Sequence, residues 1–271
     1  MAKRATKQKP APEPDDTPNL TTTDMTDITD MTHATTTRPA SLMTKSPAHI
    51  SHMFDALADR YDDMNDWIWM GLHRLWKQDA CHQTQADKGD WVLDVCTGTG
   101  DMAERLSTMV GPEGRVVALD FSAGMLEKGK QRLAGRKNIS WRQGDALDIP
   151  FEDHTFQSAV ISFGLRNVAH VPQALAEMAR VVKPGGTVVI LDTASDNPNP
   201  LGRLYMSAIM PFIGHLIGKN QDAYQYLNDS TQTFETPAEL KIRLRDAGLD
   251  KPVVKRLGFG SVVLISAQKP L

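Results

Sequence analysis

The sequence Gly89-Asp-Trp-Val-Leu-Asp-Val-Cys-Thr-Gly-Thr-Gly-Asp101 decides the fold of this chain. A short apolar run at 91–95 contains one acid and breaks directly into Thr97-Gly98-Thr99-Gly100, after which helix-forming residues begin. This pattern predicts a strand, a tight turn and a helix. Glycine lets the backbone bend sharply or approach a bound molecule closely, and the first turn of a helix presents unpaired N–H groups. We therefore expect a ligand at this turn.

The charge around the turn indicates which ligand it takes. The spacing from Gly98 to Ala103 fits a dinucleotide fingerprint, with an acid at 120 about 20 residues after the glycines. However, Asp94, Asp120 and Asp145 each follow or end an apolar run, and they would repel the pyrophosphate of NAD. S-adenosylmethionine (SAM) instead carries a sulfonium, an ammonium and a ribose diol, which carboxylates suit. We favour SAM and keep an NAD-dependent oxidoreductase as the alternative.

Composition limits the function classes further. The 271 residues, 41% of them hydrophobic, allow one large domain with a substantial core. A net charge of -3 and a pI near 6.2 give no global electrostatic footprint for nucleic acid, so no nucleic-acid partner is expected. Cys81 and Cys96 have neither metal-ligand nor disulfide spacing, which predicts a cytoplasmic protein without a metal.

Residues 1–48 are predicted to be a disordered tail, because prolines, charges and a Thr/Asp/Met run occur there without apolar periodicity. Its acids argue against an organellar transit peptide, and it lacks the apolar region of a secretion signal. The folded domain is expected at 49–271. It opens with two helices, near 51–61 and 67–81, that can lid a ligand site and that carry Tyr61 and His73 among aromatic residues.

From Asp90 onward, apolar runs and helical patterns alternate, which predicts an α/β fold with a parallel sheet that binds ligands at the carboxyl ends of its strands. The last two runs are separated by only Gly258-Phe259-Gly260, too little for a crossover helix, so they must form an antiparallel hairpin. This is the Rossmann-like, seven-stranded arrangement of class I SAM-dependent methyltransferases. The expected strands are 91–95, 115–120, 139–143, 156–162, 186–192, 252–257 and 260–267, and the expected helices are 101–110, 122–134, 172–182, 200–218 and 237–247.

Four separated motifs carry a resemblance to a known family. They are Tyr61-Asp-Asp-Met-Asn65, His73-Arg-Leu-Trp-Lys77, Ile161-Ser-Phe-Gly-Leu-Arg-Asn167 and Arg180-Val-Val-Lys-Pro-Gly-Gly186. In this order they resemble the ubiquinone/menaquinone biosynthesis C-methyltransferases over about residues 51–268. The resemblance departs at Trp69, where the family usually has a small hydroxyl residue, and at Asp192 and Ala194, where it has a glutamate and a serine. These departures border the substrate side.

The resemblance implies SAM-dependent methylation of a ring carbon of a reduced, lipid-tailed quinone. It implies SAM contacts at Thr99, Asp120, Asp145, Ala146 and Ser162, to which the glycine turn adds Asp94, Gly98 and Gly100. Arg166 and Asn167 directly follow the fourth strand, where a methyl acceptor should lie. Arg166 is our preferred anchor for the acceptor, and Tyr61, Asp62, Asn167 and His73 are further catalytic candidates. By its usual pKa His73 is the natural base, but a packing role is equally compatible with its sequence context.

The most apolar stretch, 201–218, holds Arg203, Pro211 and His215 and is at the short limit of a membrane span. It is either a core or homodimer helix, or a wall that receives an isoprenoid tail and makes peripheral contact with the inner face of the membrane. Between acceptors, we favour demethylmenaquinol over the 2-methoxy-6-polyprenyl-1,4-benzoquinol of ubiquinone synthesis or another small hydrophobic acceptor.

Two further function classes are weighed. A nucleic-acid amino-methyltransferase would carry an Asn/Asp-Pro-Pro-aromatic loop after the fourth strand, and Ser162-Phe-Gly-Leu165 stands there instead. A binding protein that keeps the fold without chemistry is disfavoured only by the intact glycine turn and its acids.

Overall fold

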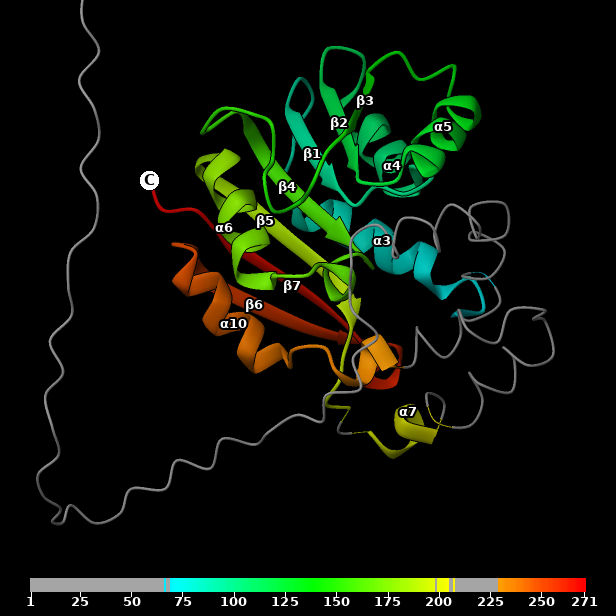
Figure 1. The fold of residues 1–271 in the computed structure, drawn as a ribbon, viewed down its shortest axis with the longest axis vertical. Coiled ribbons are helices and arrows are strands. Elements are labelled where there is room, and N and C mark those ends of the chain that lie inside the picture. Colours follow the sequence, from blue (N-terminus) through cyan, green and yellow to red (C-terminus); the bar gives the residue numbers. More distant parts are fainter. Residues whose placement is uncertain (1–65, 67–68, 198, 205–206, 208–228) are drawn as a thin grey trace, which may run out of the picture. The chain divides into compact units, whose positions relative to one another are not determined.

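A seven-stranded sheet forms the centre of the computed structural model, which describes residues 66, 69–197, 199–204, 207 and 229–271 (Figure 1). The strand order is β3-β2-β1-β4-β5-β7-β6. The first five strands pair in parallel, and β7 pairs antiparallel with both β5 and β6, so the predicted α/β fold with an end hairpin is confirmed. The strands are β1 (Trp91–Val95), β2 (Arg115–Asp120), β3 (Ile139–Gln143), β4 (Phe156–Ser162), β5 (Val182–Thr193), β6 (Asp250–Leu257) and β7 (Val262–Gln268).

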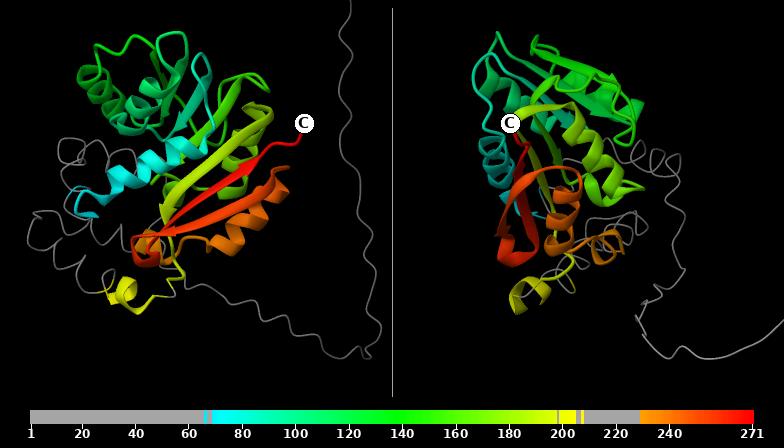
Figure 2. Two further views of the ribbon diagram at one scale, coloured as in Figure 1. Left: turned by 180° about the vertical axis from the view of Figure 1, so that it is seen from behind. Right: turned by 90° about the vertical axis from the view of Figure 1, so that its left-hand side faces the viewer.

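Helices cover both faces of the sheet. One face packs against α3, α4 and α5, and the other against α6 and α10; Figure 2 shows α3 on the opposite side of the sheet from α6 and α10. The α-helices are α3 (Leu72–Gln83), α4 (Asp101–Val110), α5 (Ala123–Arg132), α6 (Val171–Val181), α7 (Pro200–Leu204) and α10 (Pro237–Asp246). Short 3-10 turns, η1 (Leu165–Asn167) and η3 (Gly258–Gly260), follow β4 and β6.

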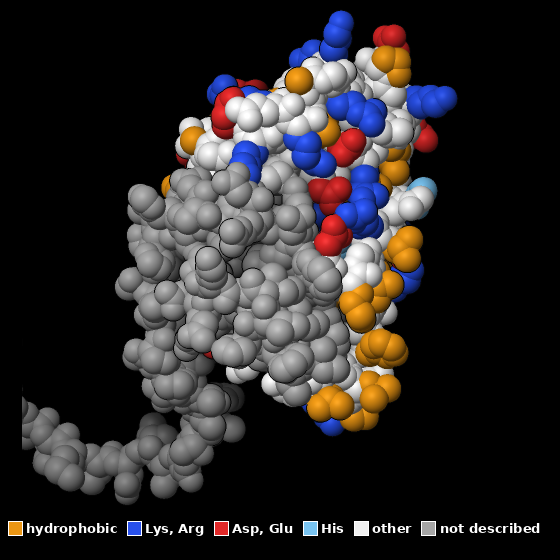
Figure 3. Space-filling view, turned by 90° about the vertical axis from the view of Figure 1, so that its right-hand side faces the viewer, with side chains coloured by type: hydrophobic (Ala, Val, Ile, Leu, Met, Phe, Trp, Pro, Cys, Tyr) orange, Lys and Arg blue, Asp and Glu red, His pale blue; other side chains and the backbone are white. Residues whose placement is uncertain are grey.

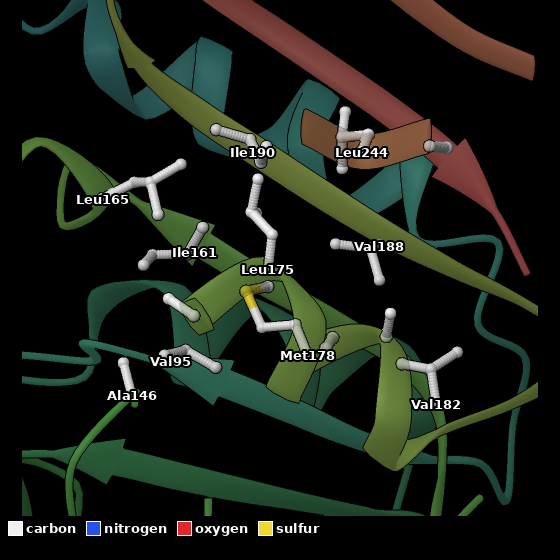
Figure 4. Close-up of a cluster of buried hydrophobic side chains, with 14 of the residues drawn as sticks. Val95, Ala146, Ile161, Leu165, Leu175, Met178, Val182, Val188, Ile190 and Leu244 are labelled. Atoms are coloured by element: carbon white, nitrogen blue, oxygen red, sulfur yellow. The ribbon is translucent and has the colours of Figure 1, made fainter. Parts of the chain in front are cut away.

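Because both faces are covered, the described residues form two apolar cores. Figure 4 shows one of them, in which Leu175 and Met178 of α6 point toward Ile161 of β4 and toward Val188 and Ile190 of β5. All five side chains are fully buried. At about 1.5–3 kcal/mol for each large apolar side chain, this burial holds α6 on the sheet.

The strand register brings several loops to one edge. Val95 at the end of β1 is level with Leu119 of β2 and Ile161 of β4, and Ser162 is level with Leu191 of β5. The residues that follow these four strands therefore lie along the same carboxyl edge of the sheet. This is the edge at which parallel α/β proteins bind ligands.

Two element boundaries differ from the sequence predictions by more than two residues. The helix expected at 67–81 is interrupted, because Met70 and Gly71 adopt left-handed backbone conformations with φ of 48° and 74°, so Trp69 is helical but α3 starts at Leu72. Strand β5 begins at Val182 rather than at 186, since the Lys-Pro-Gly-Gly segment continues the strand past an irregularity in its pairing with β4. Of the helix expected at 200–218, α7 is described; most of its remainder, the tail 1–48 and the helix 51–61 lie outside the described residues.

Candidate functional site

The turn between β1 and α4 is shaped by glycine. Gly98 and Gly100 have φ of 57° and 86°, and Gly100 is the residue that precedes the first turn of α4. A Cβ atom on Gly100 would lie 2.5 Å from the Trp141 ring, which packs beneath the turn from β3. Position 100 therefore requires glycine both for its backbone conformation and for space. The turn is closed by hydrogen bonds from the Gly100 N–H to the Thr97 carbonyl and from the Thr97 N–H to the Leu119 carbonyl, both 2.9 Å.

Asp120 connects this turn to the end of β2. Its carboxylate accepts the N–H of Gly98 at 2.7 Å and that of Ser122 at 2.9 Å. Because a carboxylate can accept about four hydrogen bonds, these two do not exhaust its capacity. Asp120 is half-buried at the carboxyl edge, so it can accept hydrogen bonds from a ribose diol while it holds the glycine turn.

Asp94 is a buried acid with an unsatisfied oxygen. The carboxylate is 1% exposed; Thr97 donates its hydroxyl to Oδ2, and Oδ1 has no hydrogen-bond partner among the described residues. Burial raises the pKa of Asp94 to about 7, although the Thr97 hydrogen bond opposes this shift. A buried carboxylate in this state gains most from a cationic or hydrogen-bond-donating ligand.

The remaining predicted cofactor residues lie on the same edge. Asp145 follows β3 and accepts the N–H of Leu147 at 2.9 Å, and Ser162 ends β4 with its Oγ buried and unpartnered among the described residues. The Ala146 side chain packs in the core near Val95, as Figure 4 shows, so it is a small buried residue rather than a polar contact. Thr99 is buried in the glycine turn, and its carbonyl accepts two N–H groups of Arg132 at 3.2 and 3.1 Å.

A buried ion pair joins α3 to the start of α4. Lys77 Nζ lies 2.7 Å from Asp101 Oδ2, and both side chains are mostly buried. Burial alone would raise the pKa of Asp101, but the charge and hydrogen bond of Lys77 outweigh it and lower the pKa to about 2. Lys77 is thus committed to Asp101. SAM therefore fits this edge, which offers the Asp94 oxygen that has no hydrogen-bond partner among the described residues, the carboxylate of Asp120 and glycines that allow close approach.

Arg166 lies on the acceptor side, in η1, and is almost completely buried. Its Nη1 donates to Asp192 Oδ1 and to the Phe163 carbonyl, both at 2.7 Å, and its backbone N–H donates to Asp192 Oδ2 at 3.2 Å. Asp192 is the next-to-last residue of β5 and is completely buried. Arg166 is therefore part of a fixed buried ion pair. This pair also fixes the position of η1, which contains the next residue, Asn167.

His73 occupies the buried side of α3. Its Nε2 lies 3.5 Å from Asp66 Oδ1, and its Nδ1 is buried without a hydrogen-bond partner among the described residues. Arg74 donates its Nε to Asp66 at 3.0 Å and so holds the acid in place. Burial, followed by the charge of Lys77, lowers the pKa of His73, which keeps the imidazole neutral at pH 7.

Aromatic rings join α3 to the end of β4. Trp69 stacks on Phe163 with centroids 6.0 Å apart, and it meets Trp76 edge-on at 5.4 Å. Trp69 and Phe163 are 5% and 6% exposed. The two stacked rings form a flat apolar surface beside the loop that carries Arg166.

The structure brings the predicted SAM residues together with Arg166 and Asn167 along one edge, whereas Tyr61 and Asp62 lie outside the described residues. Sequence reasoning missed the roles of Asp66, Lys77 and the ring stack. It also did not identify Asp192 as the partner of Arg166. Asp192 lies near the end of a strand, as Asp94 and Asp120 do, and acids in that position lie at the carboxyl edge of a parallel sheet, so this signal could have found it.

Comparison with known proteins covers most of the chain. Residues 42–269 match the model of the ubiE/COQ5 methyltransferase family. The demethylmenaquinone methyltransferase of Bacillus cytotoxicus is 38% identical over 228 residues, which cover 82% of this chain and 95% of that protein. The ubiquinone/menaquinone biosynthesis C-methyltransferase UbiE of Coxiella burnetii is 38% identical over 221 residues, covering 79% and 88%.

Solved structures support the fold alone, because their sequence identities are low. A SAM-dependent methyltransferase from Aquifex aeolicus matches with a TM-score of 0.55 and 21% identity, covering 82% of this chain and 97% of that one. The [4+2]-cyclase SpnF matches with a TM-score of 0.61 and 14% identity, covering 82% and 95%. One fold thus carries different chemistries, so the activity must be argued from the site.

Asp94 predicts a pH dependence of SAM affinity. Its pKa near 7 means that the carboxylate is largely ionised above pH 8 and largely protonated below pH 6, and a cationic ligand favours the ionised form. Affinity should be highest near pH 7–8 and fall by up to about tenfold per pH unit below about pH 6. Calorimetry across this range checks it. Asp94→Asn should bind SAM weakly with a flat profile, and a parent profile as flat as that of the variant contradicts the assignment.

The Arg166–Asp192 pair predicts a large loss of stability in Asp192→Asn. The substitution leaves a buried guanidinium without its counter-charge, which typically costs about 3–5 kcal/mol. Urea unfolding measures the loss. The matched control is Asp196→Asn, which breaks an exposed pair with Arg256 and should cost about 0–1 kcal/mol. Equal losses in the two variants would show that Arg166 has another counter-charge.

Proposed function

The chain belongs to the ubiE/COQ5 methyltransferase family, and from this premise we propose that it transfers a methyl group from SAM to a ring carbon of demethylmenaquinol. The observation that carries the proposal is the site itself. The acids of β1 and β2, whose charge favours a cationic ligand, lie at the same edge of the sheet as the stacked rings of Trp69 and Phe163, and we place the acceptor beside these rings. The name of the Coxiella relative also covers ubiquinone, so 2-methoxy-6-polyprenyl-1,4-benzoquinol is the second acceptor.

The chemistry requires the reduced form of the acceptor. SAM supplies an electrophilic methyl group on a positively charged sulfur. A quinone ring is itself electrophilic, whereas a quinol, and still more its phenolate, places electron density on the carbon that must form the new bond. The phenolate carbon forms its bond to the methyl carbon as the bond from that carbon to sulfur breaks, and S-adenosylhomocysteine leaves. The ring carbon then loses its proton while the oxygen regains one, so one proton is released overall. The protein must therefore position the ring and help a hydroxyl proton to leave.

His73 is the residue that we assign to the hydroxyl proton. Its Nε2 faces Asp66, so a proton on Nε2 leaves Nδ1 as an acceptor, and this buried Nδ1 has no partner among the described residues. Its lowered pKa keeps it unprotonated at neutral pH, which a proton acceptor needs. Asp66, fixed by Arg74, then acts as a positioning residue that holds the imidazole and stabilises its protonated form.

Arg166 has a positioning role in this proposal. Its charge is compensated by Asp192 at 2.7 Å, which limits how much it can stabilise a phenolate by charge alone. The pair instead fixes Phe163 and η1, and η1 carries Asn167 at the edge of the sheet where we place the acceptor ring. The amide can then hydrogen-bond a ring oxygen.

The lipid tail of the acceptor places the reaction next to a membrane. No helix among the described residues is long and apolar enough to cross a bilayer. We propose that the protein works from the cytoplasm at the inner face of the membrane and takes its acceptor from there. A homodimer and the tail-binding role of 201–218 stay predictions, since most of that stretch lies outside the described residues.

A direct assay tests the proposed function. Purified protein is incubated with SAM and demethylmenaquinone, either reduced with dithionite or left oxidised, and products are identified by mass spectrometry. Methylated product should form with the reduced acceptor and be absent with the oxidised one. The benzoquinol precursor in a parallel reaction ranks the two acceptors. No methylation of either quinol would overturn the proposal.

In the same assay, His73→Gln separates proton transfer from binding. Glutamine keeps a donor toward Asp66 but cannot take up a proton, so turnover should fall about 10²–10⁴-fold while SAM affinity is retained. Asp66→Asn should give a smaller loss, because it removes only the positioning carboxylate. Unchanged turnover in His73→Gln would place the proton acceptor elsewhere.

A further inference from the structure

The turn between β6 and β7 exposes a large aromatic side chain in an unusual backbone. Gly258, Phe259 and Gly260 all have left-handed conformations, with φ of 53°, 53° and 87°. A left-handed conformation is costly for a bulky residue, and Phe259 is nevertheless 63% exposed. Its apolar ring therefore gains nothing from the core that would offset this cost. Such a feature calls for a partner outside the described residues.

Helix α7 packs beside this turn and adds two exposed leucines. Leu201 is 61% exposed and Leu204 is 54% exposed. Gly202 between them lies so close to the turn that an added Cβ would stand 2.4 Å from the Phe259 carbonyl. We call the exposed side chains of Leu201, Leu204 and Phe259 the apolar platform.

Polar contacts fix the platform from beneath. Ser261 donates its hydroxyl to the Gly202 carbonyl at 3.4 Å, and Asn197 donates its side-chain amide to Ser261 Oγ at 2.9 Å. A Cβ on Gly260 would lie 2.6 Å from Asn197 Oδ1. The two segments, about 60 residues apart in sequence, are thus held as one unit, and the platform is a built surface rather than a loose loop.

The strand register places the platform on the same edge as the site. Val262, the first residue of β7, pairs with Thr193, the last residue of β5, and also with Leu257 at the end of β6. Asp192, which forms the ion pair with Arg166, pairs with Val263 of β7 and therefore lies close to the β6–β7 turn. A surface that docks here would lie at the same edge of the sheet as the loop that carries Arg166.

The platform is too small for a stable protein interface. Three partly exposed side chains present a few hundred Å², below the roughly 800 Å² that each partner of a standard interface buries. Figure 3 shows hydrophobic side chains gathered at the lower edge of one face, below a group of acidic and basic side chains. Arg203 is exposed on the adjoining face of the same helix, and its charge complements lipid phosphates. Exposed apolar side chains flanked by a basic residue match a bilayer interface.

We propose that the apolar platform inserts into the surface of an anionic lipid bilayer and so turns the acceptor site toward the lipid-tailed quinol. The claim that the acceptor site faces the bilayer rests on the proposed function, whereas the claim that the platform binds a bilayer does not. Leu201, Leu204 and Phe259 enter the boundary between headgroups and acyl chains, and Arg203 contacts phosphates. A quinol ring then reaches the site while its isoprenoid tail stays in lipid.

Vesicle flotation of the full chain tests the proposal without any quinol. The parent protein should float with vesicles of phosphatidylglycerol and phosphatidylethanolamine. A triple variant, Leu201→Gln, Leu204→Gln and Phe259→Asn, should lose at least about tenfold in partitioning. Asparagine is chosen at 259 because it tolerates a positive φ. Arg203→Gln should lose about fivefold on anionic vesicles and little on neutral ones.

The matched control replaces two exposed apolar residues outside the platform. Ile242→Gln with Val253→Thr changes side chains that are 53% and 61% exposed, and it should bind vesicles as the parent does. Methylation of a short-chain, water-soluble quinol should be unchanged in the triple variant, whereas methylation of the polyprenyl quinol in vesicles should fall. A parent that does not float, or a triple variant that floats like the parent, overturns the proposal. A triple variant that changes oligomeric state with no loss of flotation would make the platform a contact between copies, which also overturns it.

Methylation results separate this proposal from the proposed function. If no quinol is methylated but the triple variant loses flotation, the proposed function fails and the platform stands. If the short-chain quinol is methylated and the triple variant floats as the parent does, the proposed function stands and the proposal for the platform fails.

Discussion

The carboxylates at the ends of β1 and β2 are the constraint on which the site depends. Asp94 is buried with an oxygen that has no hydrogen-bond partner in the part of the chain that the structure describes, and Asp120 accepts the Gly98 N–H and the Ser122 N–H at one edge. Burying an acid in this way is unfavourable for the fold unless a ligand compensates it. A donor that carries positive charge offsets the penalty, whereas a pyrophosphate would increase it. The acids therefore select the cofactor more than the glycines do, since glycine turns serve both kinds of ligand.

The acceptor side differs from the acidic edge, because its charges compensate one another within the protein. Its strongest charges, on Arg166 and Asp192, neutralise one another at 2.7 Å, and flat rings of Trp69 and Phe163 close the space beside them. A neutral, apolar region suits a quinol ring, and among the catalytic candidates that the structure describes, His73 is the one that we propose takes up the hydroxyl proton. Helix α3 carries both His73, which contacts Asp66, and Lys77, which pairs with Asp101 at the start of α4.

Much of this edge was predictable because it depends on local sequence. A five-residue apolar run followed by glycines defines β1 and its turn, and an acid at a strand end must lie at the carboxyl edge once the sheet is parallel. The start of α3 was not predictable from periodicity, since Met70 and Gly71 break a helical pattern through their backbone conformations alone. The Arg166–Asp192 pair and the apolar platform depend on contacts between distant segments, which no local pattern encodes. The aromatic residues near Trp69 were visible, but their stacking partner Phe163 lies 94 residues later in the sequence.

The central claim is that a cationic methyl donor, and not an anionic dinucleotide, binds at the acidic edge. Isothermal titration of the purified chain with SAM and, separately, with NADH at pH 8 tests it most directly. Saturable binding of SAM with no detectable binding of NADH is the predicted result. Tight binding of NADH together with no heat from SAM would contradict the account.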